Sequence, residues 1–256
     1  MSDALGIYRE KRFSPGKVGD DRAILHSTAA QLRDAELRVQ LVEAETLGEI
    51  LDGPRIVFTM CQSIEALAVL DSLHCPVVNS PGSIRGCFRL NLVPRLEEAR
   101  VPQPRWRIAT DRMPRDLGAG PWLKRGDVHA MEAADVRRIF EEEEWHAALE
   151  AMRRRGVPAA IVQEHREGEV YKFYGVAGGF FRAYGLPAGR EADAARLAGT
   201  AANAIGLSAY GGDGVCAPDG TLTLIDLNDW PSFSRCRDEA ARAISEHLLR
   251  VLENTR

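Results

Sequence analysis

Residues 212–231 read Gly-Asp-Gly-Val-Cys-Ala-Pro-Asp-Gly-Thr-Leu-Thr-Leu-Ile-Asp-Leu-Asn-Asp-Trp-Pro, and this stretch decides the fold. Two strand-like runs, about 208–217 and 221–228, flank the dipeptide Asp219-Gly220. Both residues of Asp-Gly accept positive φ, so we expect a two-residue hairpin turn that joins two antiparallel strands. On that register Asp213 lies directly opposite Asp226, with Cβ atoms about 5 Å apart.

The hairpin is expected to gather oxygen ligands on one face. Asn228 lies two residues beyond Asp226, so both side chains project from the same face of the strand. Two facing carboxylates destabilise a sheet unless something neutralises them. Carboxylate and amide oxygens suit Mg²⁺, which leaves its other positions to water and phosphate. The alternatives are a bulge that offsets the strands, or an arginine that pairs with the acids. A one-residue slip would move Asp226 to the other face.

Strands and helices alternate through the first 80 residues. Apolar runs at 4–8, 37–42, 55–60 and 76–79 predict strands. Helices are expected from Asp20 or Asp21 to Arg33 and over residues 64–73. This alternation is typical of βαβ units and predicts a small open α/β lobe over residues 1–80.

The rest of the chain is expected to form two further lobes, a central one over 81–160 and a C-terminal one over 161–256. We expect helices over 84–100, 133–155, 191–205 and 236–253. Strands are expected over 105–110, 120–124, 159–164, 170–176 and 179–183, in addition to the hairpin. The fold class predicted from the whole pattern is α/β (α+β).

Composition excludes several classes of protein. The chain has 256 residues, with 33 basic and 37 acidic side chains and a net charge of −4, unlike the basic domains that bind nucleic acid. It has no apolar run of about 18 residues, so no membrane partner is expected, and its first residues do not resemble a signal peptide. The five scattered cysteines indicate reduced thiols and a cytoplasmic location. The oligomeric state is not indicated.

The hairpin motif resembles the metal-binding end of the ATP-grasp superfamily. That family has an acid on one strand, an acid-x-Asn on the next and a proline a few residues later. The matching residues here are Asp213, Asp226, Asn228 and Pro231. The resemblance covers roughly residues 76–253 and implies an ATP-grasp fold that holds ATP between its last two lobes. It also implies one or two Mg²⁺ ions bound by Asp213, Asp226 and Asn228.

The resemblance implies further nucleotide-binding residues upstream of the hairpin. Residues 162–164 look like the hinge strand that holds adenine, and Lys124 looks like the strand lysine that reaches the ATP phosphates. Residues 171–174 and 181–182 resemble the strand pair whose basic residues face phosphate. The implied residues are Gln163 and Glu164 near adenine or ribose, and Arg89, Lys124 and Lys172 near phosphate. Lys172 and Arg182 are the implied catalytic residues, with Arg182 at the transferred phosphoryl group or at an anionic acceptor.

Two basic loops are candidates for binding an anionic small-molecule substrate. The loop after Lys124, residues 125–131, contains one glycine where the family usually has several, so either Arg125 or His129 covers the phosphates or the loop is rigid. The loop after the first strand includes Arg12 and Lys17. Ligands of open α/β sheets bind beyond the carboxyl ends of the strands, so an anion could dock there. A solvated basic loop is the alternative.

The resemblance implies two possible reactions. In the first, a ligase activates a small-molecule carboxylate as an acyl phosphate, which an amine attacks with release of ADP and phosphate. In the second, a kinase transfers the γ-phosphate to a hydroxyl group, because residues 127–131 and 171–174 resemble inositol trisphosphate kinases. A non-catalytic nucleotide-binding module ranks last, since all three metal ligands are present.

Overall fold

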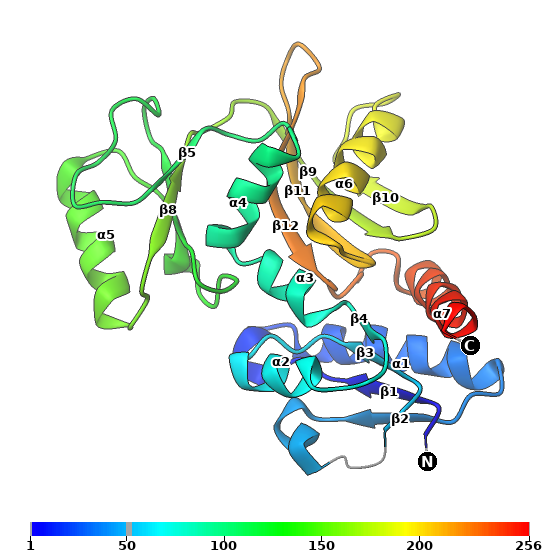
Figure 1. Cartoon of the computed structure of the whole chain (residues 1–256). Helices are drawn as coiled ribbons and strands as arrows, with labels where there is room; N and C mark the ends of the chain where they lie inside the picture. The colour runs from blue at the N-terminus through cyan, green and yellow to red at the C-terminus, as the bar shows by residue number, and fades with distance from the viewer. Residues whose placement is uncertain (1, 50–52, 256) are drawn as a thin grey trace.

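The computed structural model describes residues 2–49 and 53–255 and divides them into three lobes (Figure 1). Each lobe is built around its own four-stranded sheet. The predicted mixed α/β fold is therefore confirmed, with most elements within a few residues of the expected runs.

The first lobe holds a parallel sheet in the order β2-β1-β3-β4. Helix α1 packs on one face of this sheet, and α2 with the 3₁₀ helix η2 packs on the other. Strand alternation explains this, since Phe58 faces α1 while Val57 faces α2. The elements are β1 (Ala4–Ile7), η1 (Lys11–Phe13), α1 (Val18–Asp34), β2 (Val39–Val42), η2 (Ala44–Glu49), β3 (Ile56–Thr59), α2 (Ile64–Asp71) and β4 (Val77–Val78).

The central lobe is an antiparallel sheet, ordered β5-β8-β6-β7, covered by α5. Trp145 of α5 is fully buried on this sheet, and its indole N–H donates to the Thr110 carbonyl at 3.0 Å. The elements are β5 (Trp106–Ile108), β6 (Trp122–Arg125), η3 (Ala133–Asp135), β7 (Val136–Arg138), α5 (Glu142–Arg154) and β8 (Ala160–Gln163).

The predicted helix over 133–155 is wrong in its first third. Glu132 and Asp135 form a capping box that closes the single turn η3. The next three residues then pair with β6 as the edge strand β7, where the β-branched Val136 is well placed. The helix begins only at Glu142.

The third lobe is an antiparallel sheet, ordered β10-β9-β11-β12, backed by α4 and α6. The predicted helix over 84–100 is broken at Cys87 and Phe88 into α3 and α4. Helix α4, expected in the central lobe, packs on α6 of the third lobe instead. The elements are α3 (Pro81–Gly86), α4 (Arg89–Glu98), β9 (Glu169–Val176), β10 (Phe180–Tyr184), α6 (Glu191–Ile205), β11 (Ala209–Cys216), β12 (Leu222–Asp229) and α7 (Arg237–Asn254).

The hairpin β11–β12 reaches the predicted pairing by an unexpected route. The turn holds three residues, 218–220, rather than two, with Gly220 at φ 83° and Cys216 opposite Leu222. This offsets the expected register by one residue. A β-bulge at Ile225, which has no register partner, removes the offset, so that Asp213 faces Asp226 as predicted.

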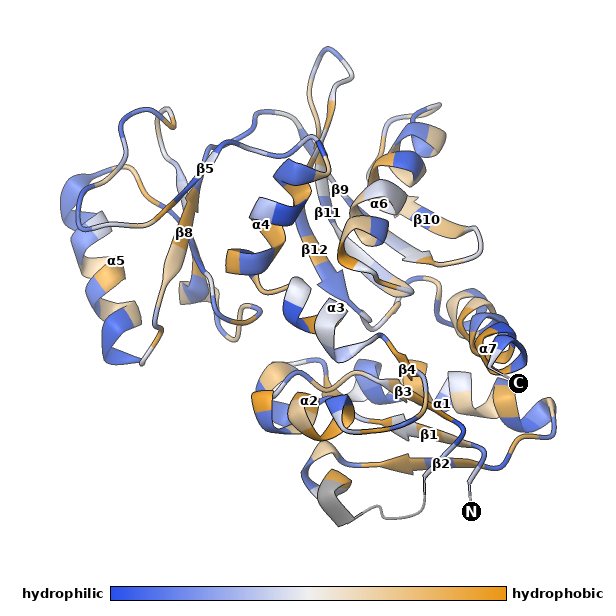
Figure 2. Cartoon of the chain, in the orientation of Figure 1, coloured by the Kyte–Doolittle hydropathy of each residue, from blue (hydrophilic) through white to orange (hydrophobic). Residues whose placement is uncertain are grey.

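The two ends of the described chain share one hydrophobic core. Helix α7 leaves the third lobe and packs along α1 of the first lobe (Figure 1). The Asn79 side chain also joins the lobes, since its amide oxygen accepts from Ser208 and Ala209 N–H groups at 2.8 and 3.0 Å. Figure 2 shows that β4 is hydrophobic, whereas the end of β12 is hydrophilic. That hydrophilic end faces the space between lobes.

Two expectations from composition can be compared with the structure. All five cysteines carry free thiols. None of the described helices combines the length and the hydropathy needed to cross a membrane.

Candidate functional site

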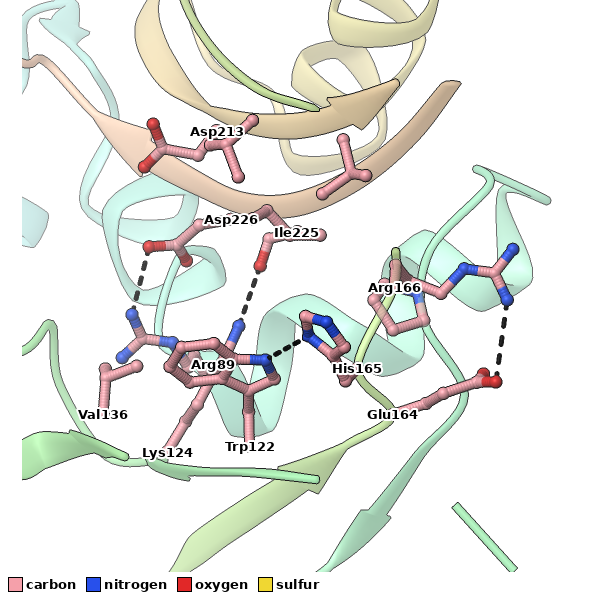
Figure 3. Close-up of a pocket in the computed structure, with 13 residues that line it drawn as sticks. Arg89, Trp122, Lys124, Val136, Glu164, His165, Arg166, Asp213, Ile225 and Asp226 are labelled. Carbon is pink, nitrogen blue, oxygen red and sulfur yellow. Dashed lines mark hydrogen bonds and ion pairs between the residues drawn. The ribbon is translucent and has the colours of Figure 1, made fainter. Parts of the chain in front are cut away.

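A cavity of about 210 Å³ lies between the central and third sheets, and we call it the inter-sheet cavity (Figure 3). One wall is apolar, and the side chains of Trp122, Val170 and Val215 contribute to it. The other end is charged. The full lining is Arg89, Pro104, Trp122, Lys124, Val136, Glu164, His165, Arg166, Val170, Asp213, Val215, Ile225 and Asp226.

Lys124 is a buried cation at the charged end of this cavity. Its Nζ donates to the carbonyl of the bulged residue Ile225 at 3.1 Å, as Figure 3 shows. Burial lowers the pKa of Lys124 to about 8, although the nearby carboxylate of Asp226 acts in the opposite direction. The bulge that restores the strand register therefore also supplies the acceptor for this lysine.

Arg89, the first residue of α4, is also buried and points at the hairpin acids. Its Nη2 lies 3.1 Å from Asp226 Oδ2, and its Nη1 donates to the carbonyl of Arg125 at 3.3 Å. Burial acts to raise the pKa of Asp226, but the charges of Arg89 and Lys124 outweigh it and hold that pKa below its ordinary value. Asp226 is therefore an ionised carboxylate between two cations.

Three charged side chains form a row across neighbouring strands, which we call the acidic row: Lys172 on β9, Asp213 on β11 and Asp226 on β12. The register places Asp213 opposite both of the others. Lys172 Nζ lies 2.7 Å from Asp213 Oδ1. Both alternatives left open by the sequence, a bulge and a pairing arginine, are thus present, and the two acids face each other all the same.

The glycines on either side of Asp213 allow this close pairing. A Cβ at Gly212 would collide with the carbonyl oxygen of Asp226, and a Cβ at Gly214 would collide with the ring of Tyr171. Glycine at these two positions is therefore a packing requirement of the acidic row.

A second cavity, of about 290 Å³, lies where all three lobes meet, and we call it the junction cavity. It shares Arg89 and Asp226 with the inter-sheet cavity, so the two adjoin. Lys172 and Asn228 also line it, as do Lys17 and His129. The cations Arg89 and Lys172 are ion-paired, whereas Lys17 has no ion pair within the part of the chain that the structure describes.

One contact at the junction cavity joins the three lobes. His129 Nε2, from the central-lobe loop, lies 2.8 Å from Asp229 Oδ1 at the end of β12. Gln62, from the first lobe, donates to the same oxygen at 3.0 Å. The side chain of Asp229 is completely buried, and that of His129 is 12% exposed. We call these three residues the junction triad.

The loop that carries His129 is held by ion pairs on its central-lobe side. Arg125 contacts Asp127 at 2.6 Å and lies 3.9 Å from the buried Asp135, which also pairs with Arg155 at 2.7 Å. Burial acts to raise the pKa of Asp135, but backbone hydrogen bonding and Arg155 lower it overall. A loop with one glycine is thus fixed at both sides instead of being supple.

Several residues expected at the site lie elsewhere. Arg182 lines neither cavity, because its guanidinium turns to Glu239 of α7 at 2.8 Å. Arg12 pairs with Glu65 at 3.5 Å over a separate surface depression. The Gln163 side chain is buried in the central sheet and lines neither cavity. The structure therefore places Arg182, Arg12 and Gln163 away from the two cavities.

Glu164, by contrast, lies at the hinge and lines the inter-sheet cavity. Its carboxylate pairs with Arg105 at 3.1 Å and with Arg166 at 3.6 Å. The hydrogen bond from Arg105 lowers the pKa of Glu164. Beside it, the Trp122 indole N–H donates to His165 Nδ1 at 3.1 Å, so both rings are fixed in the cavity wall (Figure 3).

The residues of the acidic row fit a Mg²⁺ ion. Asp213 and Asp226 face each other at the inter-sheet cavity, Asp226 also lines the junction cavity, and Asn228 adds an amide oxygen on the same strand face. Within residues 2–49 and 53–255 no three His, Cys, Asp or Glu side chains cluster as metal ligands. A site with two carboxylates and open positions is the kind that Mg²⁺ uses with phosphate, so this donor set suits Mg²⁺ better than Zn²⁺.

Comparison with solved structures decides the fold. No protein-family model and no curated protein matches the sequence. The D-alanine–D-alanine ligase from Bacillus anthracis superposes with a TM-score of 0.76 at 13% identity, with 100% of each chain covered. The RimK domain protein ATP-grasp from Sphaerobacter thermophilus gives 0.71 at 18% identity, covering 96% of this chain and 99% of that one. The chain has the ATP-grasp fold.

A third ATP-grasp structure extends the comparison. The ATP-grasp ligase PsnB, complexed with precursor peptide PsnA2 and AMPPNP, gives a TM-score of 0.63 at 16% identity, with 98% of each chain covered. At these identities the likeness concerns the fold alone. The resemblance stated from the hairpin motif is confirmed at that level.

Two residues that line the junction cavity, Asp229 and Gln62, were not expected from the sequence. Asp229 follows the motif directly but lies on the opposite strand face from Asn228, so only its buried partners reveal it. Gln62 comes from the first lobe, 167 residues away. The sequence offers one indication of Asp229, because it is an acid at the end of a strand beside a metal-binding motif.

Proposed function

We propose that the protein is an ATP-dependent ligase that activates a small, anionic carboxylate as an acyl phosphate and joins it to an amine, releasing ADP and phosphate. The observation that carries this proposal is that the two cavities adjoin at Arg89 and Asp226. A nucleotide in one cavity and an acid in the other would therefore meet at the acidic row. The fold supports the proposal, because the solved neighbours are named as ligases.

The inter-sheet cavity suits a nucleotide. Its apolar wall fits a purine ring, and Glu164, which lines the same cavity, would lie near adenine or ribose. Lys124 and Arg89 at the far end would neutralise phosphate oxygens. Phosphoryl transfer depends on charge neutralisation and positioning, which is the work that these buried cations can do.

Asp213, Asp226 and Asn228 would hold one or two Mg²⁺ ions. When bound, Mg²⁺ supplies the positive charge that offsets the charge on the transferred phosphoryl group. Arg89 and Lys172, which pair with the two acids in this structure, then have their positive charge available for phosphate. Lys172, which lines the junction cavity, is the residue that we propose to be catalytic in phosphoryl transfer, whereas Arg182 lines neither cavity and is not included in the proposal.

The junction cavity suits a small acid. Lys17 at its first-lobe rim, which has no ion pair among the described residues, could bind a carboxylate, and His129 also lines the cavity. Polar and charged side chains from all three lobes line it, which suits a small polar acid. Free thiols throughout the chain favour a cytoplasmic setting.

The test offers the purified protein MgATP with a panel of amino acids and small dicarboxylic acids, singly and in pairs. ADP and phosphate are measured, and products are followed by phosphorus NMR. A ligase forms ADP and free phosphate only when an acid and an amine are both present. Phosphate retained on an organic product would identify a kinase instead, and AMP as the product would contradict both readings.

A further inference from the structure

The junction triad fixes the proton positions on His129. Gln62 already donates to Asp229 Oδ1, so this oxygen acts as an acceptor, and we assign the hydrogen of the 2.8 Å contact to Nε2 of the His129 imidazole. A neutral ring with its proton on Nε2 has a free lone pair on Nδ1. Within the described ranges, Nδ1 has no hydrogen-bond partner, and the ring lines the junction cavity.

The surroundings hold this ring in one orientation. Phe88 meets it edge-on, with ring centroids 6.1 Å apart. Gln62 orients the Asp229 carboxylate by donating to the same oxygen as His129. On the other side, the ion pair between Arg125 and Asp127 fixes the loop. A catalytic base needs such fixed geometry, because proton transfer depends on the position of the accepting atom.

We propose that His129 is the general base for the attacking amine, with Asp229 and Gln62 as its positioning residues. This inference rests on the proposed ligase function. The amine nitrogen forms the new C–N bond with the acyl carbon, and the C–O bond to phosphate breaks, with its electron pair leaving on the phosphate. The N–H proton passes to His129 Nδ1. His129 lines the same cavity as Asp226 and Lys172, so it lies on the acceptor side of the acidic row.

This role explains why the loop after Lys124 is poor in glycine. A loop that only covers phosphates gains from a supple backbone. A loop that presents a base must hold one side chain still, and here it is tied both to its own lobe and to Asp229. The departure from the family pattern then has a chemical reason.

Hydroxylamine separates a base from a merely structural residue. It is largely unprotonated at neutral pH and traps an acyl phosphate as a hydroxamate without needing a base. His129→Gln keeps an N–H donor for Asp229 but removes the basic nitrogen. We expect this variant to lose about 10²–10³-fold in ligation with an amine, while hydroxamate formation stays within about threefold of the wild type. Asp229→Asn should likewise lose about 10²-fold in ligation with an amine while hydroxamate formation is kept, because the variant no longer fixes the tautomer of His129.

The control is His146→Gln on α5, a half-exposed histidine far from both cavities, which should leave both reactions unchanged. Equal losses of ligation and hydroxamate in His129→Gln would overturn the assignment and leave the ligase function standing. No hydroxamate and no ADP from the wild type with any acid of the panel would instead refute the ligase function.

A second measurement needs no substrate. Nitrogen-15 NMR of the histidine rings distinguishes the two tautomers, and His129 is identified by its loss in His129→Gln. We expect the proton on Nε2 in the wild type and a mixture of tautomers in Asp229→Asn. A wild-type ring with its proton on Nδ1 would overturn the proposal.

Discussion

The two adjoining cavities are built in different ways. The inter-sheet cavity is lined by two facing sheets, and its charged groups are buried cations held by a bulge carbonyl and a carboxylate. The junction cavity is lined by loops and strand ends from three lobes, and its key contact is a buried carboxylate shared by His129 and Gln62. The first arrangement favours a large, partly apolar anion such as a nucleotide. The second favours a small polar molecule and proton transfer.

The largest expected effect comes from the two acids of the acidic row, of which Asp226 lines both cavities. Asp226→Asn and Asp213→Asn should each lower ADP formation roughly 10³-fold, because each removes a charge that would hold Mg²⁺. Circular dichroism checks that the variants fold. Asp219→Asn, in the turn of the same hairpin, is the matched control and should keep full turnover. Normal turnover in Asp213→Asn would show that Asp213 is not a metal ligand.

Lys124→Met should lower kcat/KM for ATP about 10²-fold, because a charge-assisted contact to phosphate is lost.

Burial lowers the pKa of Lys124 to about 8, so the charged lysine opposes folding at neutral pH. Lys124→Met should therefore be more stable than the wild type at pH 7, by roughly 1–3 kcal/mol. The difference should shrink above pH 8, because the folded wild type releases its proton before the unfolded chain does. Urea unfolding at pH 7 and pH 10 measures the difference in stability between the variant and the wild type at each pH. A difference that grows with pH would contradict the lowered pKa of Lys124.

Val170→Asp tests the apolar wall of the inter-sheet cavity alone. Val170 is 61% exposed there, so the substitution should be tolerated by the fold. A carboxylate against a purine should raise KM for ATP about tenfold and leave KM for the acid unchanged. A larger change in KM for the acid would show that the cavities are assigned the wrong way round.

Lys17→Ala makes the reciprocal test at the junction cavity. The side chain is exposed, so solvent screens its charge, and we expect only about a threefold rise in KM for the acid. KM for ATP should not move. Lys11→Ala, in the same basic loop but outside the junction cavity, is the control.

The smallest effects are expected at Arg182 and Arg12, which lie away from the two cavities. Arg182→Ala and Arg12→Ala should each change turnover less than about twofold, because both guanidinium groups form solvent-exposed ion pairs away from the two cavities. Steady-state kinetics with a saturating acid measures this. A large loss in Arg182→Ala would show that its contact with Glu239 breaks during turnover.

Sequence reasoning found what depends on local pattern. The pairing of Asp213 with Asp226 followed from strand alternation and a turn, although the turn was one residue longer than expected and a bulge compensated. The orientation of Arg182 could not be predicted, because Glu239 competes for it from a helix that follows much later in the chain. Asp229 and Gln62 meet through packing of the lobes, which no local periodicity encodes.

The return of α7 to the first lobe has a consequence for synthesis on the ribosome. The buried face of α1, with Ile24, Leu25 and Leu32, needs α7 as well as the sheet to be covered. Part of the apolar surface of the first 80 residues is thus exposed until a helix about 160 residues later has been synthesised. The first and third lobes, which share this core, should therefore unfold as one cooperative unit.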